Sequence, residues 1–398
     1  AYRNVLGGPV SARLHAARRA PPTHTNIMWG DVAIPQVTSY KYLGAWVTNT
    51  NTWDTHLDMR MQSADKAAHA HHKAMSQVLL PIHTRKLPLT TVAQPIVTYA
   101  AQVWARPTKD MQRKLNSWQA GLAARAFHCP ANTSHMCLQQ EIGLVPLHIT
   151  CELLAMRYWH HLSTTPTDRL LSNIHTAWSG KYHPWAKSVN AMLAKYQVTN
   201  TEALVLSTAQ FKIHLSAKVV DYLRTYWQQP TRKHGPVHER YVSDFGVGET
   251  RSARTRVRSY LRELTNQPTL YCRAAELCMH MRLECLPLRA FHSHLRTNET
   301  TVARQTRELC PCCQAHSETP AHFLLECPAY SSLRSPAHIA AAIAQAQATP
   351  SPWRSLLADH PATIAHYIHD AWSIRRAALT GRGAYGGNPM ALAPVPGP

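Results

Sequence analysis

The stretch from Cys310 to Cys327, "CPCCQAHSETPAHFLLEC", constrains the fold of this chain more than any other part of the sequence. Cys310 and Cys313 are separated by two residues, which places two thiolates on one tight turn. His322 and Cys327 are separated by four residues, and the pattern predicts that they lie on a short helix. Four soft ligands in two close pairs suit tetrahedral Zn²⁺ and leave no position open for a substrate. We therefore expect a structural zinc site, which closes a loop too short to bury a core of its own.

Other cysteines and histidines leave alternatives to this ligand set. Cys312 is only two positions after Cys310, a poorer geometry for a shared ion than that of Cys313, and His316 is a spare candidate. The competing interpretation is a group of ordinary buried cysteines. The remaining cysteines lie in apolar, helix-like surroundings, which is not the pattern of a secreted disulfide scaffold and predicts a reducing compartment. They are Cys129, Cys137, Cys151, Cys272, Cys278 and Cys285.

The charge balance is basic because carboxylates are scarce. The 398 residues contain 42 Lys and Arg but only 22 Asp and Glu, which gives a formal net charge of +20. A positive field of this kind attracts polyanions, so the first candidate partner is nucleic acid. The competing interpretation is a basic surface that only keeps the chain soluble. No apolar run reaches the roughly 18 residues of a membrane span, so we expect no membrane partner. The first 30 residues carry arginines and no acid, which favours a mitochondrial address over a nuclear or cytoplasmic one.

The hydrophobic periodicity predicts a mostly α-helical fold with a small β element over residues 27–48. An amphipathic helix is expected from Leu57 to Val78, with Pro81 and Pro88 ending it. Residues 229–250 contain Pro and Gly and are expected to form a loop. The further predicted helices cover residues 90–104 with a kink at Pro95, 108–127, 134–141, 147–163, 167–178, 185–196, 210–228, 271–284, 336–347 and 361–378.

Several stretches, in order along the chain, resemble the C-terminal part of non-LTR retrotransposon reverse transcriptases. "VTSYKYLGAWVTNTNTWDTHL" is similar to the strand and helix start that follow the polymerase palm, and "LPLTTVAQPIVTYAAQVWARP" is similar to the thumb helix. "LNSWQAGLAARAFHCPANTSHMCLQQEIGLVPLHI" resembles the next segment of the family. "MRLECLPLRAFHSHL", followed by the Cys/His stretch, resembles the family's C-terminal CCHC knuckle. The resemblance covers about residues 25–165 and 270–335.

Comparison with that family also shows which catalytic residues the sequence lacks. In that family the catalytic palm lies upstream of "YKYLG", and its Tyr-x-Asp-Asp strand and a further Asp hold the Mg²⁺ ions of nucleotidyl transfer. No Asp-Asp pair occurs in this sequence, and almost nothing precedes the thumb-like segment. No endonuclease pattern, hydrolase triad or Gly-rich phosphate loop is found either. We therefore expect a protein that is not an enzyme and has no small-molecule substrate.

A polymerase thumb grips its duplex along the phosphates, so basic residues on the thumb-like helices are candidate RNA contacts. They are Arg106, Arg113, Lys114 and Arg125. A second candidate group lies in "RSARTRVRSYLR", which we expect to form a basic helix. It consists of Arg251, Arg254, Arg256, Arg258 and Arg262. Guanidinium groups fork onto phosphate oxygens and stack on exposed bases. The competing interpretation for each residue is a solvated basic face.

These observations predict five segments. They are residues 1–50, a basic N-terminal segment with the β element; 51–165, the thumb-like helices; 166–250, a helical connector and loop; 251–335, the basic helix and zinc knuckle; and 336–398, the C-terminal helices with a Pro/Gly tail.

The predicted function is that of a catalytically inactive, retrotransposon-derived protein. It would bind structured RNA, and ribosomal RNA is the first candidate. Its other partners would be the neighbouring proteins of a large ribonucleoprotein such as a mitochondrial ribosome. The large spliceosomal scaffold protein is a precedent for such a descendant. One alternative is the C-terminal portion of an active reverse transcriptase. Another is a zinc-dependent adaptor that binds protein and not RNA.

Overall fold

The computed structural model describes most of the chain as helical, which confirms the expected mostly-α class. The described residues are 27–50, 52–104, 108–179, 184–229, 235–248, 250–251, 254–265, 270–290 and 301–380. Within them, the strands form three separate two-stranded antiparallel ribbons. None of the described helices combines the length and the hydropathy that crossing a membrane requires.

The expected N-terminal β element consists of two hairpins. Strand β1 (Ile27–Trp29) pairs with β2 (Val32–Ile34) through a turn at Gly30 and Asp31, as the Gly-Asp pair predicted. Gly30 has a φ of 58°, a left-handed conformation that glycine adopts without steric cost. Strands β3 (Ser39–Tyr42) and β4 (Ala45–Thr48) form the second hairpin.

The long helix expected from Leu57 to Val78 is divided into two helices, and the second ends at Ser76, before Pro81. Helix α2 (Asp54–Ala70) stops at His71 and is followed by the short α3 (His72–Ser76). Pro81 precedes α4 (Ile82–Pro88) as its N-cap residue, and Pro88 is the last residue of that helix.

From Pro88 the chain continues as the π-helical turn η1 (Leu89–Ala93) and then as α5 (Gln94–Val97). Pro95 lies in the first turn of α5, where a missing N–H is tolerated, and the wider π turn before it leaves room for the proline ring. Ala100 has a left-handed φ of 59° and lies between α5 and the short α6 (Ala101–Trp104).

The next helices lie close to their predicted positions. They are α7 (Lys109–Ala126), α8 (His135–Ile142), α9 (Leu147–Ser163), α10 (Leu170–Ser179), α11 (Pro184–Lys195) and α13 (Thr208–Gln228), with the short, unpredicted α12 (Asn200–Leu204) before α13. Thr108 and Ser207 cap α7 and α13 by accepting hydrogen bonds from the backbone, as these residue types favour. One core joins α2, α5, α6, α7 and α9, and a second joins α9, α11, α12 and α13.

Two predictions for residues 229–262 are wrong. The expected loop contains helix α14 (Gly235–Phe245), whose His238 and Tyr241 are buried, so apolar burial overrides the Gly and Pro signals. The expected basic helix over 251–262 begins instead with the hairpin strands β5 (Thr250–Arg251) and β6 (Arg254–Thr255). Only the short α15 (Ser259–Thr265) is helical there.

The C-terminal region packs helices on either side of the Cys/His segment. Helix α16 (Leu270–Arg282) is followed by α17 (Thr301–Glu308), the π-helical η3 (His322–Glu326) and the 3₁₀ turn η4 (Pro328–Tyr330). Four helices complete this region: α18 (Ser331–Arg334), α19 (Ala337–Gln347), α20 (Pro352–Asp359) and α21 (Pro361–Thr380). The predicted Pro/Gly tail lies outside the described residues, as does the predicted basic segment before Ile27.

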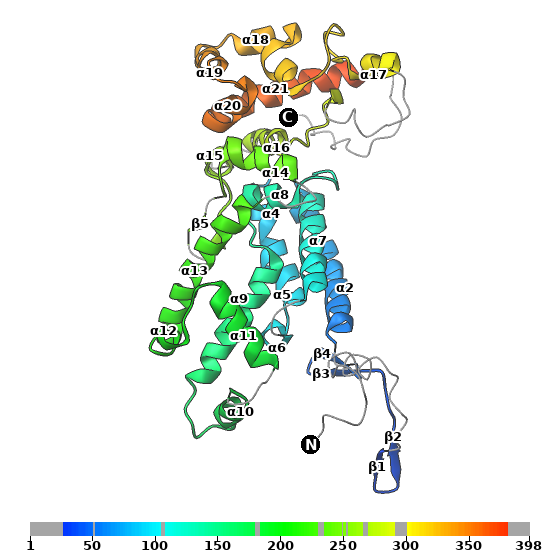
Figure 1. Cartoon of the computed structure of the whole chain (residues 1–398). Coiled ribbons are helices and arrows are strands. Elements are labelled where there is room, and N and C mark those ends of the chain that lie inside the picture. Colours follow the sequence, from blue (N-terminus) through cyan, green and yellow to red (C-terminus); the bar gives the residue numbers. More distant parts are fainter. Residues whose placement is uncertain are drawn as a thin grey trace.

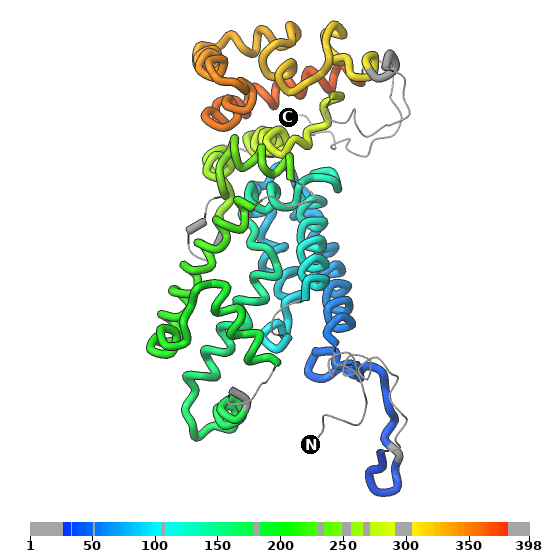
Figure 2. Tube along the Cα trace, in the orientation of Figure 1, coloured from blue at the N-terminus to red at the C-terminus, as the bar shows by residue number. Residues whose placement is uncertain are grey.

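The molecule is elongated (Figure 1). The β1–β2 hairpin projects at one end, the helices from α2 to α13 form the middle, and α17 to α21 form a layer at the other end. The tube in Figure 2 shows the same order along the sequence, with α21 returning across α16, on which it packs. The largest core spans this junction, because it contains Ala68 and Leu122 of the body together with Trp372 of α21. The C-terminal layer and the helical body are therefore packed as one structure.

Candidate metal centre and basic surface

The first half of the candidate metal centre is a tight turn. The Leu309 and Ser317 backbones form a β-bridge, and the N–H of Cys310 donates to the His316 carbonyl at 2.8 Å. The N–H of Gln314 donates back to the Cys310 carbonyl at 3.0 Å, and Gln314 takes the left-handed φ of 59° that reverses the chain. Cys310 and Cys313 are thereby held on the inside of the turn.

The second half is the π-helical turn η3. The Thr319 hydroxyl accepts a hydrogen bond from the His322 N–H at 3.0 Å, which fixes the start of η3. The Cys327 N–H donates to the His322 carbonyl at 2.8 Å. This i→i+5 hydrogen bond places His322 and Cys327 one above the other, so the His-x4-Cys spacing brings both side chains to the same face.

The four donors have the geometry of a metal site. The ligand atoms of Cys310, Cys313, His322 and Cys327 all lie within 4.8 Å of one another. The Sγ atoms of Cys310 and Cys327 are 3.8 Å apart, and Cys313 Sγ is 3.3 Å from His322 Nε2. Zinc–sulfur bonds of about 2.3 Å in a tetrahedron place two sulfurs about 3.8 Å apart. The spacing of the donors thus fits one tetrahedral ion.

The two spare candidate ligands lie outside this group. Cys312 turns toward η4, where its Sγ is 3.1 Å from the Tyr330 hydroxyl oxygen. His316 is exposed, and its ring centroid is 5.6 Å from that of His322. The structure therefore brings Cys313, and not Cys312, together with Cys310, His322 and Cys327. The reason is that the Cys-x2-Cys turn points its first and last side chains the same way.

Burial favours the uncharged forms of the donors. Burial raises the pKa of Cys327 to about 12, and a hydrogen bond with Cys312 together with burial raises the pKa of Cys310. Burial lowers the pKa of His322, which leaves a neutral imidazole with a free lone pair. A bound metal ion would supply the positive charge that stabilises the thiolates in this buried setting.

Helix α21 anchors the turn through a buried ion pair that the sequence analysis did not identify. Arg375 donates from Nε to Glu318 Oε1 at 2.6 Å and from Nη2 to Oε2 at 2.9 Å. The Tyr367 hydroxyl, from the same helix, donates toward the carbonyls of Phe323 and Leu324 in η3 at 3.0 and 2.9 Å. The ligand-bearing segments are therefore positioned by a helix that follows them in the sequence.

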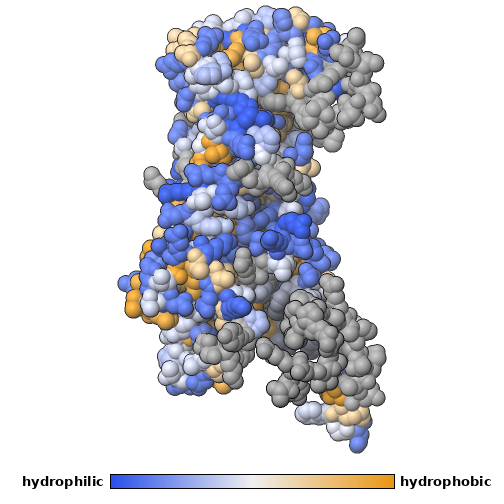
Figure 3. Space-filling model, viewed as in Figure 1, coloured by the Kyte–Doolittle hydropathy of each residue, from blue (hydrophilic) through white to orange (hydrophobic). Residues whose placement is uncertain are grey.

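The first group of candidate RNA contacts lies on α7, beside α2. Figure 3 shows that hydrophilic side chains cover the middle of this face, where Figure 1 places the two helices. Arg113 and Arg125 are 79% and 63% exposed, and Lys114 is 44% exposed. Arg106 lies outside the described residues.

These three bases are paired with acids, which the sequence analysis missed. Arg113 pairs with Asp110 on its own helix, and Lys114 pairs with Asp58 of α2. Arg125 Nη2 lies 3.9 Å from Asp65 Oδ1 of α2, and the Trp118 indole donates to the same oxygen at 3.0 Å. The sequence could not predict that Asp58 and Asp65 pair with bases of α7, because these acids lie on α2 and contact α7 only when the two helices pack side by side.

The second group is not a single surface. Arg256 is exposed, Arg262 is half-buried, and the strands carry Arg251 and Arg254, whose side chains are not described. Arg258 is only 7% exposed, and this corrects its place among the candidate RNA contacts. Its guanidinium donates to carbonyls of the turn after α14 and, at 3.0 Å, to the Tyr241 hydroxyl. It supports that turn and is not available to a phosphate.

The interior charges nearly cancel, so they do not account for the positive charge of the chain. Among the described residues, the buried bases are Arg85, Arg258, Arg273, Arg282 and Arg375, and the buried acids are Glu141, Glu152, Glu276 and Glu318. Most of these pair directly: Arg282 Nε, for example, lies 2.8 Å from Glu141 Oε1. The net positive charge therefore belongs to the rest of the chain.

No family model, no curated protein and no solved structure matches this chain. The resemblance to reverse transcriptases therefore remains a prediction from the quoted stretches of sequence.

Proposed function

We propose that this chain is a catalytically inactive, retrotransposon-derived protein that binds structured RNA as an architectural part of a large ribonucleoprotein. The observation that carries the proposal is the edge of α7 that exposes Arg113, Lys114 and Arg125, each paired with an exposed acid, on a chain of net charge +20 whose buried charges nearly balance. Such an edge contacts phosphates and requires no particular base sequence. The proposed setting is a ribosome, with ribosomal RNA as the partner, and the basic, acid-free N-terminal composition suits a mitochondrial one.

The spacing along α7 suits a nucleic-acid backbone. Lys114 and Arg125 are eleven residues apart, so they lie on the same face of the helix about 16 Å apart. Their ion pairs with Asp58 and Asp65 are exposed, and exposed pairs contribute only about 0–1 kcal/mol. A phosphate can therefore replace either acid as the partner of the base, at little cost in protein stability.

We propose that the Cys/His centre holds a structural Zn²⁺ ion in a CCHC knuckle. Cys310, Cys313, His322 and Cys327 supply four protein ligands, which leaves no coordination position for a substrate. The ion would brace the turn against α21 and hold the C-terminal layer in shape, while the RNA contacts lie on the helical body.

A second candidate function is favoured by the N-terminal hairpins. Trp29 and Val32 of the first hairpin are 80% and 68% exposed, and Leu43 of the second is 77% exposed; a further domain would cover these apolar side chains. A polymerase palm in front of residue 27 would make this chain the C-terminal portion of an active reverse transcriptase. The reading frame upstream of the chain separates the two functions: an Asp-Asp strand there, together with primer extension by the full protein, would favour the polymerase.

Binding of a fluorescein-labelled RNA hairpin, followed by fluorescence anisotropy over 50–200 mM salt, tests the proposed function. The double variant Lys114→Gln/Arg125→Gln removes two phosphate contacts, each worth a slope of about 0.9 in log K against log salt for a duplex. We expect the salt slope to fall by about 1.8. The double variant Asp58→Asn/Asp65→Asn releases the same bases and should tighten binding at low salt.

The matched control is Arg224→Gln on α13. Arg224 is exposed and pairs with Asp221 on its own helix, and Figure 1 shows α13 on a different part of the body from α2 and α7. We expect its effect on RNA affinity to be much smaller. Unchanged affinity and salt slope in the Lys114/Arg125 variant would refute an RNA surface on α7.

A further inference from the structure

The His-x4-Cys arrangement of the metal centre occurs a second time, at the end of α16. His280 and Cys285 have the same spacing as His322 and Cys327. The backbone geometry is also the same, because the Cys285 N–H donates to the His280 carbonyl at 2.9 Å, an i→i+5 hydrogen bond. Glu284, just before the cysteine, has a φ of 51°, which turns the chain sharply out of the helix. The turn brings the His280 and Cys285 side chains together.

A third donor comes from the corner after α7. Cys129 follows that helix, and its N–H donates to the Ala124 carbonyl at 2.9 Å. The ligand atoms of Cys129, His280 and Cys285 all lie within 4.8 Å of one another. The three residues are 7%, 4% and 4% exposed, so the group is buried at the junction of α7 and α16.

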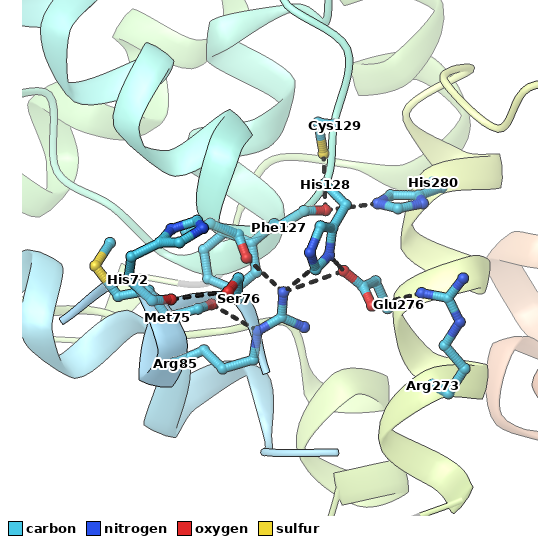
Figure 4. A network of polar contacts seen from close by, with 11 residues as sticks. His72, Met75, Ser76, Arg85, Phe127, His128, Cys129, Arg273, Glu276 and His280 are labelled. Carbon is cyan, nitrogen blue, oxygen red and sulfur yellow. Dashed lines mark hydrogen bonds and ion pairs between the residues drawn. The ribbon is translucent and has the colours of Figure 1, made fainter. Parts of the chain in front are cut away.

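The surroundings hold the imidazole in place and keep it neutral. The Phe127 carbonyl accepts hydrogen bonds from His280 Nε2 at 2.8 Å and from the Cys129 thiol at 3.6 Å (Figure 4). Burial lowers the pKa of His280 to about 4, and a hydrogen bond to Cys285 raises the pKa of Cys129. Two buried thiols and a neutral imidazole are the donor set that a borderline-soft divalent cation prefers.

The charges of the site also suit a divalent cation. Glu276 lies nearby, but its carboxylate is already engaged by Arg85 at 3.1 Å, by Arg273 at 3.0 Å and by His128 at 2.9 Å (Figure 4). It therefore provides no spare negative charge. Two thiolates neutralise Zn²⁺, so an ion at Cys129 and Cys285 would leave no net charge in this buried position.

We propose that Cys129, His280 and Cys285 bind a second Zn²⁺ ion, separate from the knuckle. Binding releases the two thiol protons to solvent and forms two Zn–S bonds and one Zn–N bond. The ion joins the corner after α7 to the end of α16, the point where the chain passes from the helical body to the C-terminal layer. Its role is to fasten these two parts together.

Zinc content of the full chain, purified under reducing conditions and measured by inductively coupled plasma mass spectrometry, tests this site. We expect two zinc ions per chain in the wild type, one in Cys285→Ser and one in Cys313→Ser. The matched control is Cys278→Ser, which alters a buried cysteine of α16 outside both groups and should retain two ions.

A titration of the metal-free wild-type chain with Co²⁺ gives a readout that does not depend on a variant folding. Tetrahedral Co²⁺ absorption should rise until two equivalents are bound, with a thiolate charge-transfer band for each. Saturation at one equivalent would overturn the proposal. So would a Cys129–Cys285 disulfide found by mass spectrometry in the reduced preparation, or an unchanged zinc content in Cys285→Ser.

Discussion

The ion pair between Glu318 and Arg375 gives the sharpest test of how α21 holds the knuckle. Glu318 is fully buried and Arg375 is 5% exposed, and two hydrogen bonds of 2.6 and 2.9 Å join them. Glu318 also accepts a hydrogen bond from the Arg289 N–H at 2.9 Å. Glu318→Gln preserves the shape of the side chain but removes its charge, so the guanidinium of Arg375 is left buried without a counter-charge.

The expected cost follows from that uncompensated charge. Removing one partner of a buried pair destabilises a protein by about 3–5 kcal/mol. That is a large fraction of the total free energy of unfolding, which is about 5–15 kcal/mol for most domains. The double variant Glu318→Gln/Arg375→Met removes both charges, so we expect it to be more stable than Glu318→Gln alone.

Urea unfolding followed by circular dichroism measures the loss, and a chromogenic chelator measures zinc release at each urea concentration. In Glu318→Gln, zinc release should shift to lower urea together with unfolding, because the ion pair ties the knuckle to α21. Arg376→Gln, an exposed change one residue along, is the matched control and should change stability by less than about 0.5 kcal/mol. A loss below about 1 kcal/mol in Glu318→Gln, or a double variant no more stable than the single, would refute this account of the anchor.

Three further predictions test other parts of the structure. Cys313→Ser should abolish metal binding at the knuckle, whereas Cys312→Ser should retain it, because the Cys312 sulfur faces Tyr330; equal metal loss in both would contradict the assigned ligands. Burial lowers the pKa of His148 from 6.5 to about 4, so the unfolded chain binds a proton that the folded chain does not. Stability should therefore be complete above pH 6.5 and fall as the pH drops toward 4, and His148→Gln should flatten that decline in urea titrations. Gly143→Ala should destabilise the fold by more than Gly246→Ala: both glycines have a positive φ, but a Cβ at 143 would lie 2.3 Å from the Arg256 carbonyl, while 246 faces open space. Equal thermal shifts would contradict that packing.

Features that depend on local spacing could be predicted from the sequence. The 3.6-residue periodicity placed α7, α9 and α13 within a few residues of their observed positions, and the Gly-Asp pair placed the first hairpin turn. The Cys-x2-Cys and His-x4-Cys spacings selected a group of four donors that the structure brings together, because a short turn leaves few alternative geometries. Pro88 is the last residue of α4, as a helix-ending proline predicts, and the helix expected over 90–104 is divided into η1, α5 and α6.

The sequence by itself determined the mostly helical class, the excess of basic residues and the local form of the knuckle, since each depends on composition or on residues a few positions apart. Only the tertiary structure decided how distant side chains combine. The Arg258 side chain is buried because it packs against α14 and Glu141. Lys114 forms an ion pair with Asp58 because α2 packs beside α7. Cys129 reached Cys285 across more than a hundred intervening residues. These long-range contacts depend on which apolar faces of the helices pack together, and the spacing of residues along the chain does not predict that packing.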